Sequence, residues 1–258
     1  MSRFGGQVPA ACLVEPIAVG AGVLVPPKGY LERLRAICDA HRLLLVFDEA
    51  ASGLGRSGGA LASRDLGVTP DLVVLGEEIA NGAQPIGAVL VRDEIGATIW
   101  GSPEAAKAAR LIPAPPSSGA CAAACATLNL YVRERLFDRA ERLVPVFLDA
   151  MFSLSDLPVI ADIRGYGLLA ALDFVPTRIA GARGSEMRAR LESAGLVIEI
   201  RGDTAILAPA LTTDERQIER MAAILREALS RRSWSEPPRR SFGRERAVSG
   251  VARDQSGR

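Results

Sequence analysis

The sequence predicts an α/β protein, in which a mostly parallel sheet with flanking helices over residues 1–156 is followed by a small α+β domain over residues 157–230. Two observations carry this prediction. In the first part, short apolar runs bounded by turn residues alternate with helical stripes, a pattern typical of strands buried on both faces of a parallel sheet. After Pro158, hairpin-like pairs of short strands alternate with helices.

The first part reads as strands and helices in turn. The expected strands are residues 10–17, 43–47, 72–75 and 86–91, and the expected helices are residues 29–42, 60–66, 119–136 and 138–153. The first strand, helix and strand form a βαβ unit, which implies a parallel pair with a right-handed crossover. The strand at residues 86–91 is expected to be buried, and residues 101–118, rich in Pro, Ala and Ser, to form a loop.

The second part should hold a small mixed domain and a tail. The expected elements are strands at 159–167, 168–175, 196–200 and 205–209 and helices at 186–193 and 214–229. In the last helix, apolar residues recur at three- and four-residue steps, as on the buried face of a helix. The tail, residues 231–258, is rich in arginine and has no periodicity. A basic arm for nucleic acid is one interpretation, but a solvated, disordered tail is favoured.

Composition narrows the function classes. A net charge of +1 gives no electrostatic reason to expect nucleic acid or an acidic membrane as a partner. The chain shows no signal peptide and no apolar run long enough to cross a bilayer, so a soluble cytoplasmic protein is expected. The four cysteines contain no C-x-x-C pair and there is one histidine, which excludes a zinc cluster of the usual kind. Cys121 and Cys125 are expected to be small buried residues in a reducing compartment.

Two pairs of acids follow neighbouring apolar runs. Asp48 and Glu49 end the run at residues 43–47, and Glu77 and Glu78 end the run at 72–75. In open α/β sheets ligands bind beyond the carboxyl ends of the strands, so Asp48 and Glu77 mark the expected site. Such acids serve as metal ligands, as general acid–base groups or as partners of a buried cation. They also serve purely structural roles, as helix caps or solvated strand ends.

The glycine-rich loop after Glu49 offers a different interpretation. Residues 53–58 match G-x-G-x-x-G after a strand, the pattern of a dinucleotide-binding turn. Two acids separate the strand from the first glycine and would repel a pyrophosphate, and no clear helix begins at the third glycine to supply its dipole. Asp71, the candidate ribose ligand, precedes its strand instead of ending it. The dinucleotide interpretation is therefore disfavoured.

Longer segments resemble a known family. The runs VEPIAVGAGVLVPPKGYLERLRAICDAHRLLLVFDEAASGLGRSG and GVTPDLVVLGEEIANGAQPIGAVLVRDEI resemble class III, fold-type I aminotransferases, which use pyridoxal phosphate, and most closely the ω-amino acid:pyruvate (β-alanine:pyruvate) group. The resemblance continues through ACAAACATLNLYVRERLFDRA, DIRGYGLLAALDF and LVIEIRGDTAILAPALTTDERQIERM. It covers about residues 9–230. Several motifs agree in order and spacing, so the resemblance is specific.

The resemblance implies a cofactor site with one decisive change. Asp48 stands where the family holds the pyridine nitrogen protonated, which makes the ring an electron sink, and Ala50 where a branched residue packs on the ring face. The family lysine that forms an imine with the cofactor falls at Glu77. The chain has two lysines in all, Lys28 and Lys107, and neither follows a predicted strand.

Other departures agree with this change. The family threonine that contacts the cofactor phosphate of the neighbouring subunit aligns with Pro113, which has neither a hydroxyl nor an N–H group. The substrate-binding arginine aligns with Glu199, although Arg201 would face the same side of a strand. The segments that resemble the family do not include its first part, which supplies the phosphate-binding turn and an aromatic residue that contacts the cofactor ring. Open sheet edges are therefore expected unless a partner covers them.

These residues imply weak or no binding of pyridoxal phosphate. The chain is then either an inactive homologue or a non-catalytic subunit that forms a homo- or heterodimer with an aminotransferase-family chain. A third hypothesis, an active enzyme whose missing part lies on another polypeptide, conflicts with Glu77, because losing a catalytic nucleophile removes many orders of magnitude in rate.

Overall fold

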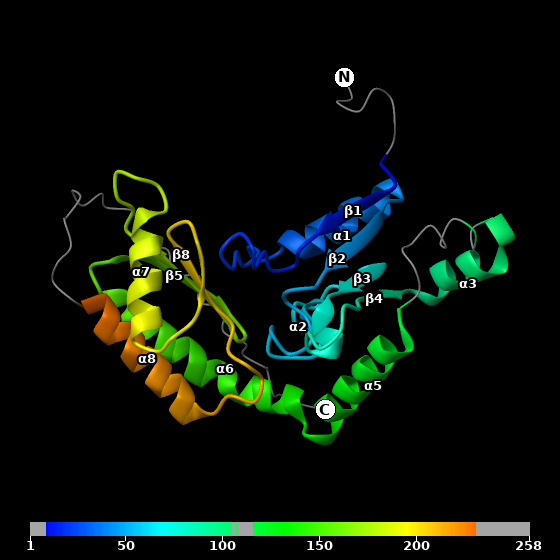
Figure 1. The fold of residues 1–258 in the computed structure, drawn as a ribbon. Helices are drawn as coiled ribbons and strands as arrows, with labels where there is room; N and C mark the ends of the chain where they lie inside the picture. The colour runs from blue at the N-terminus through cyan, green and yellow to red at the C-terminus, as the bar shows by residue number, and fades with distance from the viewer. Residues whose placement is uncertain (1–8, 105–106, 108–115, 231–258) are drawn as a thin grey trace, which may run out of the picture.

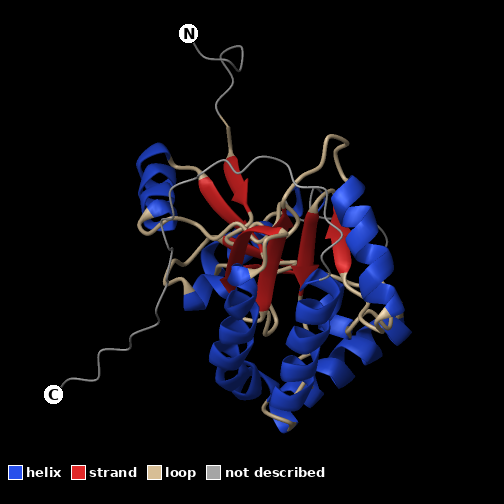
Figure 2. Cartoon of the chain, turned by 90° about the vertical axis from the view of Figure 1, so that its left-hand side faces the viewer, coloured by secondary structure: helices blue, strands red, loops and turns tan. Residues whose placement is uncertain are grey.

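The computed structural model describes residues 9–104, 107 and 116–230. The predictions for Pro113 and for the tail at residues 231–258 lie outside the described residues. The described chain contains two four-stranded sheets, β1-β2-β3-β4 and β5-β6-β8-β7, which lie side by side (Figure 1). The strands gather in the interior with the helices around them (Figure 2).

The first sheet is mostly parallel, as predicted. Its strands are β1 (Ala11–Val14), β2 (Leu44–Asp48), β3 (Leu72–Leu75) and β4 (Ala88–Val91). The pairs β1–β2 and β2–β3 are parallel and β3–β4 is antiparallel. Helix α1 (Tyr30–His41) connects β1 to β2 and buries Leu31 and Cys38 against Leu45 and Phe47 of β2, which confirms the predicted βαβ unit.

The strand β4 corrects one expectation. Residues 86–91 were expected to form a buried strand, but Val89 is 54% exposed and Leu90 is 46% exposed. β4 is the last strand of its sheet, so only one of its edges is paired, with β3, and the other edge has no neighbouring strand among the described residues. Helix α3 (Asp93–Gly101) follows and buries none of its residues. It includes the first residue of the segment expected to be a loop.

The remaining elements of the first part are helical. They are α2 (Ala62–Asp65), the 3-10 helix η1 (Glu77–Ala80), α5 (Ser118–Arg133), α6 (Leu136–Phe152) and the 3-10 helix η2 (Ser153–Asp156). Helix α5 buries Ala120, Ala124, Thr127 and Tyr131. Cys121 and Cys125 are exposed, so the expectation that they are buried is wrong. In an alanine-rich helix several faces are equally apolar, and the pattern alone does not select the buried one.

The second sheet is antiparallel throughout. Its strands are β5 (Ile160–Tyr166), β6 (Leu169–Phe174), β7 (Glu199–Arg201) and β8 (Thr204–Leu207), and its helices are α7 (Ala182–Ser193) and α8 (Glu215–Ser230). Helix α7 begins four residues before the predicted position. The Asp203 carboxylate, in the β7–β8 turn, accepts hydrogen bonds from the N–H groups of Gly181 and Gly184, which satisfies donors at the start of the helix.

The hydrophobic core does not stop at the boundary between the two parts. The largest cluster joins Leu54, Val73 and Leu75 to Phe147 of α6 and to Leu172 of β6. A second cluster joins residues of the loop after β1 to β6 and β8: Ile17, Val19 and Val23 pack with Leu169, Ala171 and Ile206. The division at residues 156 and 157 stays a prediction about topology.

Among the described helices, none has the length and apolar character needed to cross a bilayer. Within residues 9–104, 107 and 116–230, no three side chains of the His, Cys, Asp or Glu type gather where they could bind a metal ion.

Candidate functional site

The two predicted site acids lie at the same edge of the first sheet. Asp48 ends β2, at the level of Val74 in the parallel neighbour β3. Glu77 begins η1, one residue after the glycine that follows β3. Asp48 is half-buried and its Oδ1 accepts a hydrogen bond of 3.1 Å from the N–H of Ala50, whereas Glu77 is exposed. The carboxyl-edge placement predicted from strand order therefore holds for both.

Glu49, next to Asp48, has a structural role. It is 1% exposed, and its carboxylate accepts hydrogen bonds from the N–H groups of Ala62 at 2.6 Å and Ser63 at 2.8 Å. These N–H groups begin α2, where backbone donors have no partner within the helix. Of the interpretations open for this acid pair, helix capping applies to Glu49. Asp48 is left as the acid available to a ligand.

The backbone approaches itself closely between Ala50 and Gly76. A Cβ atom placed on Gly76 would lie 3.0 Å from both the Cβ and the carbonyl oxygen of Ala50, and 2.8 Å from Oε2 of Glu78. Ala50, predicted to pack on a cofactor ring, is half-buried. Close packing between the turns after β2 and β3 therefore explains why the residue before Glu77 is a glycine.

Arg56 and Tyr131 also lie near this edge, and no sequence pattern pointed to them. The Tyr131 hydroxyl donates a 2.9 Å hydrogen bond to the carbonyl oxygen of Glu78, and burial raises the pKa of Tyr131. Arg56 donates to the carbonyl oxygens of Ala208 at 3.0 Å and Pro209 at 2.6 Å. Burial lowers the pKa of Arg56, while the negative charge of Glu78 acts in the opposite direction.

The glycine-rich loop joins the two sheets. Gly55 (φ +99°) leaves no room for a Cβ beside Leu211, and Gly58 (φ +105°) faces Val144 of α6. The N–H of Leu168, in the β5–β6 turn, donates to the carbonyl oxygen of Arg56 at 2.8 Å. The G-x-G-x-x-G spacing thus reflects left-handed backbone and close packing, which need glycine, and the loop's described contacts account for it without a phosphate.

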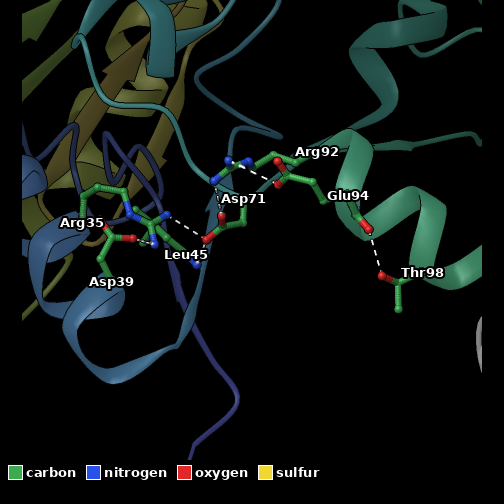
Figure 3. A network of polar contacts seen from close by, with 7 residues as sticks. All are labelled: Arg35, Asp39, Leu45, Asp71, Arg92, Glu94 and Thr98. Atoms are coloured by element: carbon green, nitrogen blue, oxygen red, sulfur yellow. Dashed lines mark hydrogen bonds and ion pairs between the residues drawn. The ribbon is translucent and has the colours of Figure 1, made fainter.

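Asp71, the acid considered for a ribose contact, is buried and lies in a network of ion pairs (Figure 3). Its carboxylate accepts from Arg35 Nη1 at 2.7 Å, from Arg92 Nη1 at 3.1 Å and from the N–H of Leu45 at 2.7 Å. Burial opposes its ionisation, but these three donors outweigh burial, so the pKa of Asp71 lies below its ordinary value. The network ties α1, β2 and the residue after β4 to the start of β3.

The other basic residues considered for the chemistry do not replace the missing lysine. Lys28 is exposed in the turn before α1, and Lys107 is also exposed. Glu199 and Arg201 share one face of β7, as predicted, and pair with each other at 2.6 Å. Arg201 also donates to the carbonyl oxygen of Gly20 at 3.2 Å.

Two surface hollows lie away from the sheet edge. One, of about 470 Å³, is lined by residues at the start of α7 together with Ile200 and Gly202. The other, of about 460 Å³, is lined by residues of α6 and the start of α8. Neither lining includes Asp48, Ala50 or Glu77.

Pyridoxal phosphate, the cofactor that the resemblance implies, fits these residues only in part. Asp48 is a half-buried carboxylate at a strand end and suits a protonated ring nitrogen. Glu77 carries a carboxylate where covalent attachment needs a primary amine. Glu77 and Glu78 also place two acids at this edge, and their negative charge disfavours a doubly charged phosphate nearby. The described residues therefore do not fit the covalently held cofactor.

Comparison with known proteins identifies the family. The model for "Aminotransferase class-III" matches residues 4–229, and this family uses pyridoxal phosphate. The chain is 41% identical to an omega-aminotransferase of Caulobacter vibrioides and 36% identical to the omega-amino acid–pyruvate aminotransferase of Pseudomonas putida. These alignments cover 85% and 86% of this chain and 51% and 50% of the relatives. The chain thus spans about half the length of the curated relatives it matches.

Solved structures agree. An amine transaminase from an uncultivated Pseudomonas species, in its PLP-bound form, matches with a TM-score of 0.77 and 32% identity, over 88% of this chain and 53% of the other. A transaminase with L-Ala matches with a TM-score of 0.79 and 29% identity, over 85% of this chain and 54% of the other. The mixed, mostly parallel sheet and its helices therefore have the architecture of part of a transaminase, and the chain belongs to the class III aminotransferases.

Proposed function

We propose that this chain is a non-catalytic class III aminotransferase homologue. The family activity would be the pyridoxal-phosphate-dependent transfer of an amino group from an ω-amino acid or amine to a keto acid such as pyruvate. The observation that carries the proposal is Glu77, an exposed carboxylate at the carboxyl end of β3, where the family resemblance places the imine-forming lysine.

The chemistry explains why this one position outweighs the rest. A carboxylate has no N–H group to condense with an aldehyde, so Glu77 cannot hold the cofactor covalently. Glu77 could accept a proton. Without a covalent bond between the protein and the cofactor, however, no substrate would be held in position for this proton transfer. Loss of a catalytic nucleophile typically removes several orders of magnitude in rate. The fit of Asp48 to a ring nitrogen gives at most a weak, reversible complex, since each missing charge-assisted hydrogen bond to a phosphate is worth about 1.5–3 kcal/mol.

Borohydride reduction tests this proposal. The purified chain is mixed with pyridoxal phosphate and reduced, and the adduct is measured by intact mass and peptide mapping. We expect the folded chain to give no more adduct than the urea-unfolded chain. Lys28 and Lys107 are exposed, so they react with pyridoxal phosphate non-specifically, whether or not the chain is folded. The variant E77K, which places an amine at the strand end, is expected to give more adduct when folded than when unfolded. A full-length aminotransferase is the positive control.

Specific labelling of Lys28 or Lys107 in the folded wild-type chain, together with turnover of an amine and pyruvate, would overturn the proposal.

A second function, that of a non-catalytic subunit, is favoured by the exposed surface of β4 and α3. Val89 is 54% exposed, Trp100 is 77% exposed and α3 buries no residue. Apolar edges of this kind are typical of surfaces covered by another chain. Co-expression with a full-length class III aminotransferase is expected to give a heterodimer on size-exclusion chromatography. Recovery of the chain alone, as an aggregate, would instead leave the inactive homologue as the better account.

A further inference from the structure

Two cysteines from different elements meet beneath α1. Cys12 of β1 is paired in parallel register with Leu45 of β2, and residues that pair across neighbouring strands point to the same face of a sheet. Leu45 is fully buried under α1, in the cluster that contains Cys38 and against which Cys12 packs. Cys12 and Cys38 therefore lie among the same apolar side chains under α1, and besides burial, the presence of Cys12 contributes to raising the pKa of Cys38. Both are free cysteines.

The two thiols differ in access. β1 is an edge strand, and Cys12 at the rim is half-buried. Cys38 is 1% exposed, and burial, with Cys12 beside it, raises the pKa of its thiol. A small reagent can therefore reach Cys12 from the edge of the sheet, while Cys38 is buried and is not directly accessible to the reagent. An accessible thiol next to a protected one is the arrangement in which the first reacts and the second resolves.

We propose that Cys12 and Cys38 form a thiol pair that a low-molecular-weight disulfide, such as oxidised glutathione, converts to an intramolecular disulfide. The Cys12 thiolate attacks one sulfur of the reagent, forming a mixed disulfide and releasing one glutathione thiolate. The Cys38 thiol then attacks the Cys12 sulfur, forming the Cys12–Cys38 bond, and its proton passes to the departing glutathione thiolate, which leaves as the second glutathione. Two protein thiols are oxidised and one disulfide is reduced to two thiols.

The bridge would restrain a segment that joins the two sheets. The chain between positions 12 and 38 carries Ile17, Val19 and Val23, which pack against Leu169 and Ile206 of the second sheet. Closing this loop covalently removes conformations from the unfolded chain, and it stabilises the folded state as long as native geometry is kept. Oxidation would therefore fix the edge strand to its covering helix and hold the connecting segment between the sheets.

Mass spectrometry and thermal unfolding test the pair. The variant C121S/C125S removes the two exposed cysteines of α5 and keeps only Cys12 and Cys38. It is incubated folded with oxidised glutathione, then alkylated and measured. We expect a mass about 2 Da below the reduced chain with no alkylation, a Cys12–Cys38 peptide, and a rise in Tm of about 5–10 °C that a reductant reverses.

Single variants in the same background separate the roles of the two thiols. C38A is expected to stop at a mixed disulfide on Cys12 and to show no rise in Tm, whereas C12S is expected to react much more slowly, because its remaining thiol is buried. A stable glutathione adduct on Cys12 in the parent, a disulfide that forms only in urea, or a fall in Tm on oxidation would each overturn the proposal.

Discussion

Replacing Asp71 with asparagine is expected to lower the free energy of unfolding by about 3–4 kcal/mol. The buried carboxylate accepts hydrogen bonds from Arg35, Arg92 and the N–H of Leu45 (Figure 3). An asparagine leaves Arg35 without that negative partner. Urea denaturation near pH 7 measures the loss. The control is Asp39→Asn, which removes the exposed partner of the same arginine and should cost less than about 1 kcal/mol.

The effect should depend on pH with a definite sign. Because the folded pKa of Asp71 is depressed, its contribution is present above the unfolded value of about 3.9 and is lost as pH falls through the folded pKa. The difference in stability between wild type and Asp71→Asn should therefore shrink as pH falls from 7 toward 3. A difference that stays constant over this range would contradict the ion-pair account.

Gly167→Ala is expected to destabilise the fold by about 3–5 kcal/mol. Gly167 has φ +61°, and a Cβ there would lie 2.3 Å from the backbone carbon of Ser57 and 2.5 Å from the carbonyl oxygen of Arg56. Backbone atoms cannot move aside as a flexible side chain can, so the β5–β6 turn would separate from the glycine-rich loop. Thermal or urea unfolding followed by circular dichroism measures the loss.

Gly202→Ala provides the matched control for this change. Gly202 has φ +58°, and a Cβ there meets nothing within 4 Å. This variant measures only the loss of stability caused by placing alanine in a left-handed backbone conformation, which is about 1–2 kcal/mol. Equal losses for the two variants would show that the contact between the loop and the turn contributes nothing.

Sequence patterns predicted those helices and strands that pack against elements close to them in the chain. β2, β3 and α1 were placed by apolar runs and a helical stripe, and strand order placed Asp48 and Glu77 at one edge. The patterns did not separate Asp48 from Glu49, because the N–H groups that bind Glu49 belong to α2. The start of α7 depends in the same way on Asp203, which follows the helix in the chain.

Burial was the least predictable property. β4 is as apolar as β2 in sequence, but it lies at the end of its sheet, and a strand is buried only where other elements cover it. Likewise, Cys121 and Cys125 are as small and apolar as the residues beside them that α5 buries. Strand order marked Glu77 as a site position, but its equivalence to the imine-forming lysine, like the role of Ala50, rests on family resemblance, because no local pattern indicates either role.

The core shared by the two sheets bears on how this chain can be divided. Leu54, Val73 and Leu75 lie in the same cluster as Leu172 and Phe147. A cut near residue 156 would therefore expose apolar side chains to solvent on both pieces. Neither piece would keep a closed interior of its own. In engineering terms, we expect fragments cut at this boundary to be less soluble than the undivided chain, because each would expose side chains that the shared cluster buries.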